Sequence, residues 1–93
     1  MIVGVCTVRL ALPGTNSLKA KRSVIKGLMH RARRQFEVAA AEVDEQDQHR
    51  RAILAFVCVA NEGRHAEAVL QKLVNWLDAQ LPGHLEDFQI ERR

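Results

Sequence analysis

The residues best suited to binding a charged ligand lie in one stretch, residues 17–34. It holds seven Lys and Arg side chains and neither Asp nor Glu. They are half of the 14 Lys and Arg in the chain, namely Lys19, Lys21, Arg22, Lys26, Arg31, Arg33 and Arg34. Cations at this density neutralise backbone phosphates of nucleic acids. This stretch is therefore the candidate nucleic-acid or anion-binding segment.

The spacing of apolar residues predicts that residues 17–34 form an amphipathic helix. Apolar residues recur at intervals of three, four and seven residues, so they lie on one side of a helix, namely Leu18, Ile25, Leu28, Met29 and Ala32. At 100° per residue, a polar set falls within about 80° on another side, namely Lys19, Arg22, Lys26, His30 and Arg33. Lys21 points towards the apolar side, where we expect its ammonium to reach out to the edge.

The start of this helix is a candidate anion site. Asn16 or Ser17 can supply the N-cap oxygen. Free backbone N–H groups at a helix start favour anions. Together with the polar side chains of Thr15, Asn16 and Ser17 and the three cations Lys19, Lys21 and Arg22, they could hold a phosphate. The same cations are unfavourable beside the positive end of the helix dipole unless an anion is bound. The alternative is a solvated basic face paired with Glu residues from elsewhere.

A second polar segment, residues 42–49, is acidic, but its spacing matches no metal-binding loop. Its ionisable residues are Glu42, Asp44, Glu45, Asp47 and His49. Acidic residues between two strands are usually a solvated turn. The sequence also contains no G-x-S-x-G, H-E-x-x-H or phosphate-loop motif. We predict no catalytic residue, metal or cofactor; an enzyme with an anion pocket at Arg22 remains an alternative.

Length and composition predict one globular domain, residues 1–93. The chain is 47% hydrophobic and 27% charged, and no apolar run approaches the length of a membrane span. Residues 1–36 carry eight Lys and Arg and no acidic residue, an asymmetry typical of proteins that face a polyanion. Without a charged leader, we expect a cytoplasmic protein. Cys6 and Cys58 fit buried, reduced thiols rather than a zinc or redox motif.

Hydrophobic patterning predicts an α+β fold with the element order β-α-β-β-α-β. The predicted strands are residues 2–10, 36–43, 52–60 and 85–90, and a second helix runs from about residue 61 to Pro82. Right-handed crossovers place both helices on one face of a four-stranded antiparallel sheet, with the first and third strands central. This arrangement is ferredoxin-like.

The predicted fold leaves one sheet face uncovered, and that face is apolar. If even-numbered strand residues face the helices, the open face presents Val3, Val5, Ile53, Val57 and Val59. An exposed apolar patch marks an interface, so we expect a homo-oligomer, most simply a dimer, formed through it. RNA-recognition motifs place stacking aromatics on this face. Here Phe36, Phe56 and Phe88 are even-numbered and predicted in the core, so RNA binding by the sheet face is not expected.

Several segments resemble the bacterial YlxP-like proteins. Residues 17–24 read S-L-K-A-K-R-S-V, residues 41–47 read A-E-V-D-E-Q-D, and residues 59–61 read V-A-N, each similar to a segment of that family at matching spacing. The resemblance implies a ferredoxin-like fold and a family of unknown function without established catalytic residues. It also implies genes often beside transcription-elongation, translation-initiation and ribosome-maturation factors.

Two main functional hypotheses follow, besides the anion-pocket enzyme. The first is an RNA- or ribosome-associated binding module in which Lys19, Arg22, Lys26, Arg33 and Arg34 contact phosphates with little base specificity. The second is an oligomeric interaction or regulatory module that works through the open sheet face. The sequence does not identify the RNA or the protein partner.

Overall fold

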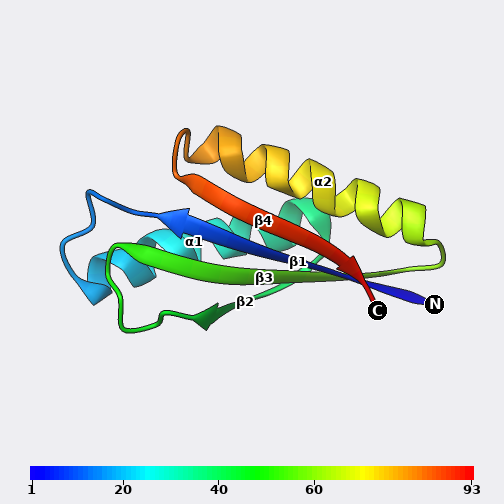
Figure 1. Ribbon diagram of the computed structural model, residues 1–93, viewed down its shortest axis with the longest axis horizontal. Helices are drawn as coiled ribbons and strands as arrows, with labels where there is room; N and C mark the ends of the chain where they lie inside the picture. Colours follow the sequence, from blue (N-terminus) through cyan, green and yellow to red (C-terminus); the bar gives the residue numbers. More distant parts are fainter.

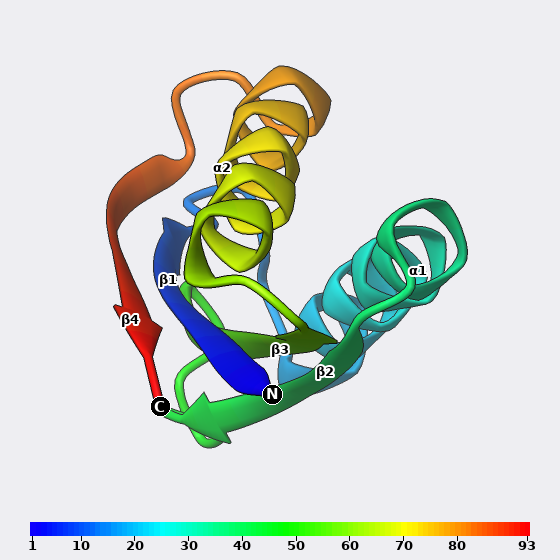
Figure 2. The same ribbon diagram turned by 90° about the vertical axis from the view of Figure 1, so that its right-hand side faces the viewer.

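The computed structural model describes residues 1–93 and has the predicted βαββαβ order (Figure 1). The elements are β1 (Ile2–Ala11), α1 (Leu18–Phe36), β2 (Ala39–Asp44), β3 (Arg51–Ala60), α2 (Gly63–Gln80) and β4 (Leu85–Arg92). The strands form one antiparallel sheet in the order β2-β3-β1-β4, and both helices lie on one side of it (Figure 2). The ferredoxin-like fold prediction is confirmed, including the central position of β1 and β3.

The core forms because the even-numbered residues of the central strands point towards the helices. Cys6, Val8 and Leu10 of β1 face the helices together with Leu54 and Phe56 of β3, and all are fully buried. Burial raises the pKa of the Cys6 thiol to about 11, and burial also raises the pKa of Cys58. Both cysteines are free and buried, as predicted. Neither helix is long and apolar enough to cross a membrane.

Two details of the predicted core and element boundaries are wrong. Residue 36 ends α1 rather than starting a strand, because Glu37 adopts the left-handed conformation and its N–H bonds to the carbonyl of Arg33. Phe36 then packs edge-on against Trp76, with ring centroids 5.7 Å apart. Phe88 was expected in the core but is 39% exposed, because β4 is an edge strand and only β1 flanks it.

The sheet face opposite the helices is uncovered. The five predicted interface residues lie on it, because Val3 pairs with Val59, Val5 with Val57, and Arg9 with Ile53 across β1 and β3. Val59 is 66% exposed, and the other four are half-buried between their strand neighbours. We call this surface the open face.

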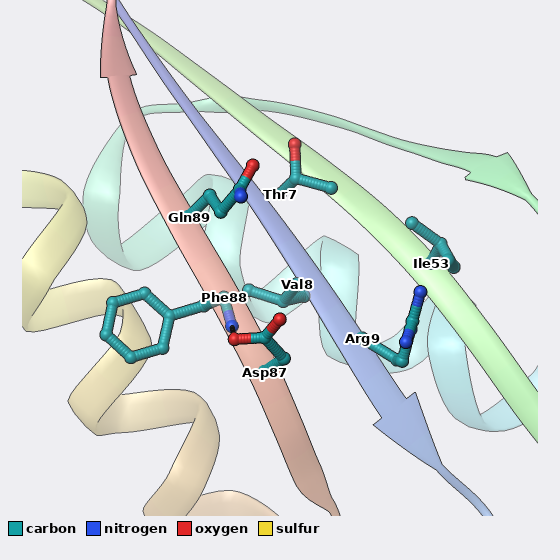
Figure 3. A pocket seen from close by; sticks show the side chains of 7 residues that line it. All are labelled: Thr7, Val8, Arg9, Ile53, Asp87, Phe88 and Gln89. Carbon is teal, nitrogen blue, oxygen red and sulfur yellow. Dashed lines mark hydrogen bonds between the residues drawn. The ribbon is translucent and has the colours of Figure 1, made fainter.

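One end of the open face is hollowed between β1, β3 and β4 (Figure 3). The hollow encloses about 180 Å³ and is lined by Thr7, Val8, Arg9, Ile53, Asp87, Phe88 and Gln89. This volume is below the range of roughly 300–1,000 Å³ that is typical of small-molecule sites. Besides the backbone bonds of the β1–β4 ladder, the Phe88 amide donates to the Asp87 carboxylate at 2.8 Å.

Candidate functional site

The predicted cations of α1 form one exposed surface, apart from Lys21. Its members are Lys19, Arg22, Lys26, Arg33 and Arg34, and we call them the basic face. Arg31 and His30 are exposed beside it. No carboxylate lies within 4.0 Å of any of these side chains, since the four ion pairs of the structure are Lys21–Glu42, Arg51–Glu86, Arg92–Glu67 and Arg93–Glu91. The Glu partners considered in the sequence analysis are therefore not present.

The apolar side of α1 holds the basic face in place. Ile25, Leu28 and Ala32 are buried against the core, so the cations between them in sequence point away from the sheet. Arg33 also donates from Nη2 to the carbonyl of Ala40 in β2, at 2.7 Å. That bond ties the C-terminal end of the basic face to the edge of the sheet.

The start of α1 exposes four of the six residues proposed for an anion site, Asn16, Ser17, Lys19 and Arg22, whereas Thr15 and Lys21 are buried. Ser17 is the N-cap, and its Oγ accepts a hydrogen bond from the amide of Ala20 at 3.1 Å. Its oxygen therefore serves as the helix cap, and its O–H can still donate to an anion. Lys19 and Arg22 are exposed nearby, and no acidic residue occupies the first turn. Cations without a compensating carboxylate leave positive potential at this end of the helix.

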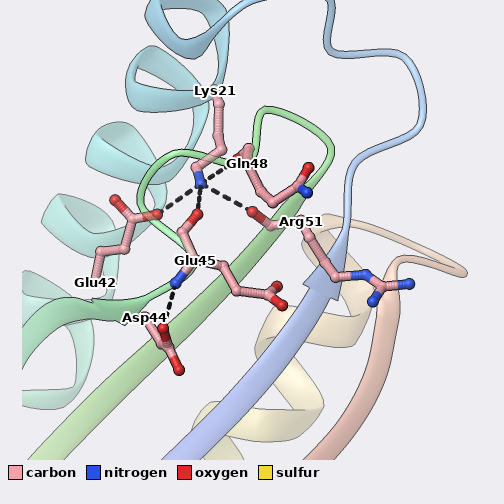
Figure 4. A network of polar contacts seen from close by, with 6 residues as sticks. All are labelled: Lys21, Glu42, Asp44, Glu45, Gln48 and Arg51. Atoms are coloured by element: carbon pink, nitrogen blue, oxygen red, sulfur yellow. Dashed lines mark hydrogen bonds and ion pairs between the residues drawn. The ribbon is translucent and has the colours of Figure 1, made fainter.

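Lys21 does not belong to this surface. Its side chain is fully buried, and Nζ lies between α1 and the β2–β3 hairpin (Figure 4). Nζ is 2.8 Å from Oε2 of Glu42 and donates to the carbonyls of Glu45 at 2.7 Å and Arg51 at 2.9 Å. It also donates to the carbonyl of Gln48. The prediction that the ammonium reaches the edge and binds an external anion is wrong.

The ammonium of Lys21 is buried because it donates hydrogen bonds to backbone carbonyls of the β2–β3 hairpin. An ammonium carries three protons, and three carbonyls of the hairpin accept them. Glu42 then balances the charge as the fourth oxygen neighbour, although its Oε2 makes no hydrogen bond of good geometry. A buried ammonium without such partners would carry a large desolvation penalty. Lys21 is thus a structural cation.

The sequence itself contains a signal for this contact. Lys21 lies on the apolar side of the predicted helix, where a solvated lysine is out of place. The carboxylate of Glu42, on the helix-facing parity of β2, is its partner. The S-L-K-A-K-R-S-V and A-E-V-D-E-Q-D segments therefore meet in space. The remaining acidic residues of the hairpin stay separate, and no group of three or more His, Cys, Asp or Glu is placed to hold a metal ion.

Comparisons with known proteins agree with this fold. The chain is 26% identical over 78 residues to "Uncharacterized protein YlxP" of Bacillus subtilis (strain 168), covering 84% of this chain and 85% of that protein. Among solved structures, the de novo designed protein LFR1 1 with ferredoxin fold has a TM-score of 0.61 at 11% identity, covering 100% of this chain and 83% of that one.

A second solved structure is a putative antibiotic biosynthesis monooxygenase from Chloroflexus aurantiacus J-10-fl. Its TM-score is 0.53 at 11% identity, covering 98% of this chain and 91% of that chain. At such identity, the likeness extends to the fold alone. The family model "Protein of unknown function (DUF503)" matches residues 3–90. Since this match runs from β1 to β4, the chain belongs to the DUF503 family of proteins of unknown function.

Proposed function

We propose that the protein is an RNA- or ribosome-associated binding module that contacts backbone phosphates through the basic face of α1. The observation that carries this proposal is five exposed cations on one helix surface with no carboxylate within ion-pair distance. Unpaired cations on a rigid element keep their charge available for a polyanion. Phosphates are the strongest such ligands because each contact releases a condensed counterion.

Binding through backbone phosphates would depend little on the base sequence of the RNA. Base recognition in single-stranded RNA relies on aromatic side chains that stack on bases. The chain has no Tyr, and Phe56 is fully buried, while Phe36 and Trp76 pack against each other. Phe36 and Trp76 are half-buried, and Phe88 lies on β4 at the opposite edge of the sheet from β2, so no fully exposed ring lies beside the basic face. Contacts from Lys and Arg to phosphates would then determine the affinity and the orientation of the complex. The protein would distinguish RNAs by their shape rather than by their base sequence.

A salt titration tests the proposal. We expect saturable binding to purified ribosomal subunits and to a generic structured RNA, measured by fluorescence anisotropy between low and physiological salt. Five phosphate contacts predict a log–log slope of the association constant against salt of about −3.5 to −4.5, from roughly 0.7–0.9 per contact. Absence of binding at low salt, or binding with a slope near zero, contradicts the proposal.

A second candidate function is self-association through the open face. The observation that favours it is the contiguous apolar set that β1 and β3 present there, Val3, Val5, Ile53, Val57 and Val59. Stacking two such faces removes the set from water and stabilises the pair by roughly 25 cal/mol per Å² of apolar surface. The protein would then act as a dimeric interaction or regulatory module.

Charge placed in the centre of the open face tests the second candidate. We expect Val57→Lys to raise the dimer dissociation constant at least tenfold in sedimentation equilibrium, because a lysine would be desolvated against the partner sheet. Val24→Lys is the matched control, since Val24 is 40% exposed on α1, away from this face. Equal dissociation constants for the two variants would eliminate the open face as the dimer contact.

A further inference from the structure

The outer edge of β4 is unpaired, and its register against β1 is unbroken from Asp87 to Arg92. β4 pairs only with β1, so its other side carries no strand. Val3 and Arg93 exchange both backbone hydrogen bonds, at 3.0 and 2.7 Å. Since these bonds alternate along an antiparallel ladder, the odd-numbered residues of β4 bond to β1, and Phe88, Ile90 and Arg92 direct their N–H and C=O groups outward. The Asp87 carboxylate accepts from the outward amide of Phe88 at 2.8 Å.

The opposite edge of the sheet is closed by comparison. There, the carbonyl of Ala40 accepts from Arg33 of α1, and the register of β2 against β3 shifts between Glu42 and Asp44. A side chain on the edge and a bulge are two common devices that prevent strand addition. β4 spans eight residues, and its one register shift against β1 lies at its start, between Leu85 and Asp87. The sheet therefore has one edge that accepts a further strand.

We propose that β4 pairs antiparallel with β4 of a second copy across a two-fold axis at Gln89. Charge favours this partner, because β4 carries Glu86 and Asp87 near its start and ends at Arg92, which Arg93 follows. Antiparallel pairing brings the acidic start of each copy beside the basic end of the other. Centring the axis on Gln89 aligns Phe88 of each copy with Ile90 of the other, on the side that faces the helices.

The register also accounts for the exposure of Phe88. In an isolated copy, Phe88 is 39% exposed at the rim of the core, and Ile90 beside it is half-buried. Two Phe88–Ile90 cross-strand pairs would bury both side chains over a continuous eight-stranded sheet. Asp87 would release the Phe88 amide to a carbonyl of the other copy. The alignment also sets Asp87 of one copy against Glu91 of the other, which is a like-charge contact. Two cations offset it: Arg9 lies beside Asp87 on β1, and Arg93 is 3.1 Å from Glu91.

Cysteine cross-linking tests the register. Gln89 would lie opposite itself as a non-hydrogen-bonded pair, with Cα atoms about 4.5 Å apart, within the range of a disulfide. We expect Gln89→Cys to form a disulfide-linked dimer under mild oxidation, whereas the native Cys6 and Cys58 stay buried and unreactive. Asp78→Cys, exposed on α2, is the control for random collision. Cross-linking of Gln89→Cys at the rate of this control overturns the proposal.

Two further variants separate this edge from the open face. Thr7→Cys lies beside Gln89 on the open face but one strand inward, so it cross-links only if two faces stack. Cross-linking of Gln89→Cys without Thr7→Cys supports the edge, and equal cross-linking of both overturns it. By sedimentation equilibrium, we also expect Phe88→Lys to weaken dimerisation at least tenfold with an unchanged thermal melt. An unchanged dissociation constant for Phe88→Lys overturns the proposal as well.

Discussion

Replacing Lys21 with Met is expected to lower the free energy of unfolding by about 3–5 kcal/mol, as for other buried pairs that lose one partner. The substitution leaves three hairpin carbonyls without their donor and Glu42 without its countercharge. Each buried group that loses its partner keeps its full desolvation penalty. The whole free energy of unfolding of a domain of this size is about 5–15 kcal/mol, so the variant would be only marginally stable.

Urea denaturation at constant pH measures this effect. Lys19→Met is the matched control, because Lys19 is exposed two residues away in the same helix and makes no ion pair. We expect the control to change the free energy of unfolding by no more than about 0.5 kcal/mol. Glu42→Gln should lie between the two, since it removes the countercharge but leaves the three carbonyl bonds. Similar unfolding midpoints for the two Met variants would show that the hairpin does not depend on Lys21.

Reversing three charges of the basic face, Lys19→Glu, Arg22→Glu and Lys26→Glu together, is expected to remove most RNA affinity. Three lost contacts at roughly 0.7–0.9 each would reduce the log–log salt slope by about 2–3. The fold should survive, because all three side chains are exposed and acidic residues near a helix start interact favourably with its dipole. Anisotropy with the same RNA across salt measures the change, and thermal melts check the fold.

An equal charge change elsewhere is the control for net charge. Arg50→Glu, Arg64→Glu and Lys72→Glu alter three exposed cations outside α1, none of which is in an ion pair. If the basic face is the binding surface, this control should weaken binding only slightly, through the longer-range potential. If both triple variants lose affinity equally, binding is due to the overall charge of the protein rather than to α1.

The fold was predictable because its patterning is consistent from one element to the next. β3 is apolar at nearly every position, which requires cover on both sides and a central place in the sheet. The even-numbered residues of β1 and β3, such as Val8 and Phe56, enter the core as the alternation predicted. Helix α1 follows from apolar residues at helical spacing. These are local regularities, so a single sequence contains them.

The exceptions depend on neighbours that a single sequence does not identify. Lys21 was counted among surface cations because long cationic side chains usually reach water, and its carbonyl partners come from a hairpin more than 20 residues away. The exposure of Phe88 depends on strand order, which leaves β4 at an edge. The basic face was predictable as a set of positions. Its lack of carboxylate partners was not, because eleven acidic residues elsewhere in the chain could have reached it.

The central place of β1 has a consequence for how the chain folds during synthesis. β1 leaves the ribosome before the other three strands, yet it pairs with β3 about 50 residues later and with β4 about 80 residues later. Until residues 85–92 emerge, one side of β1 has no strand beside it and its backbone groups are open to other chains. The sheet is therefore completed only after residues 85–92 have emerged. Pauses in translation ahead of residue 85 would extend the period in which the nascent protein can aggregate.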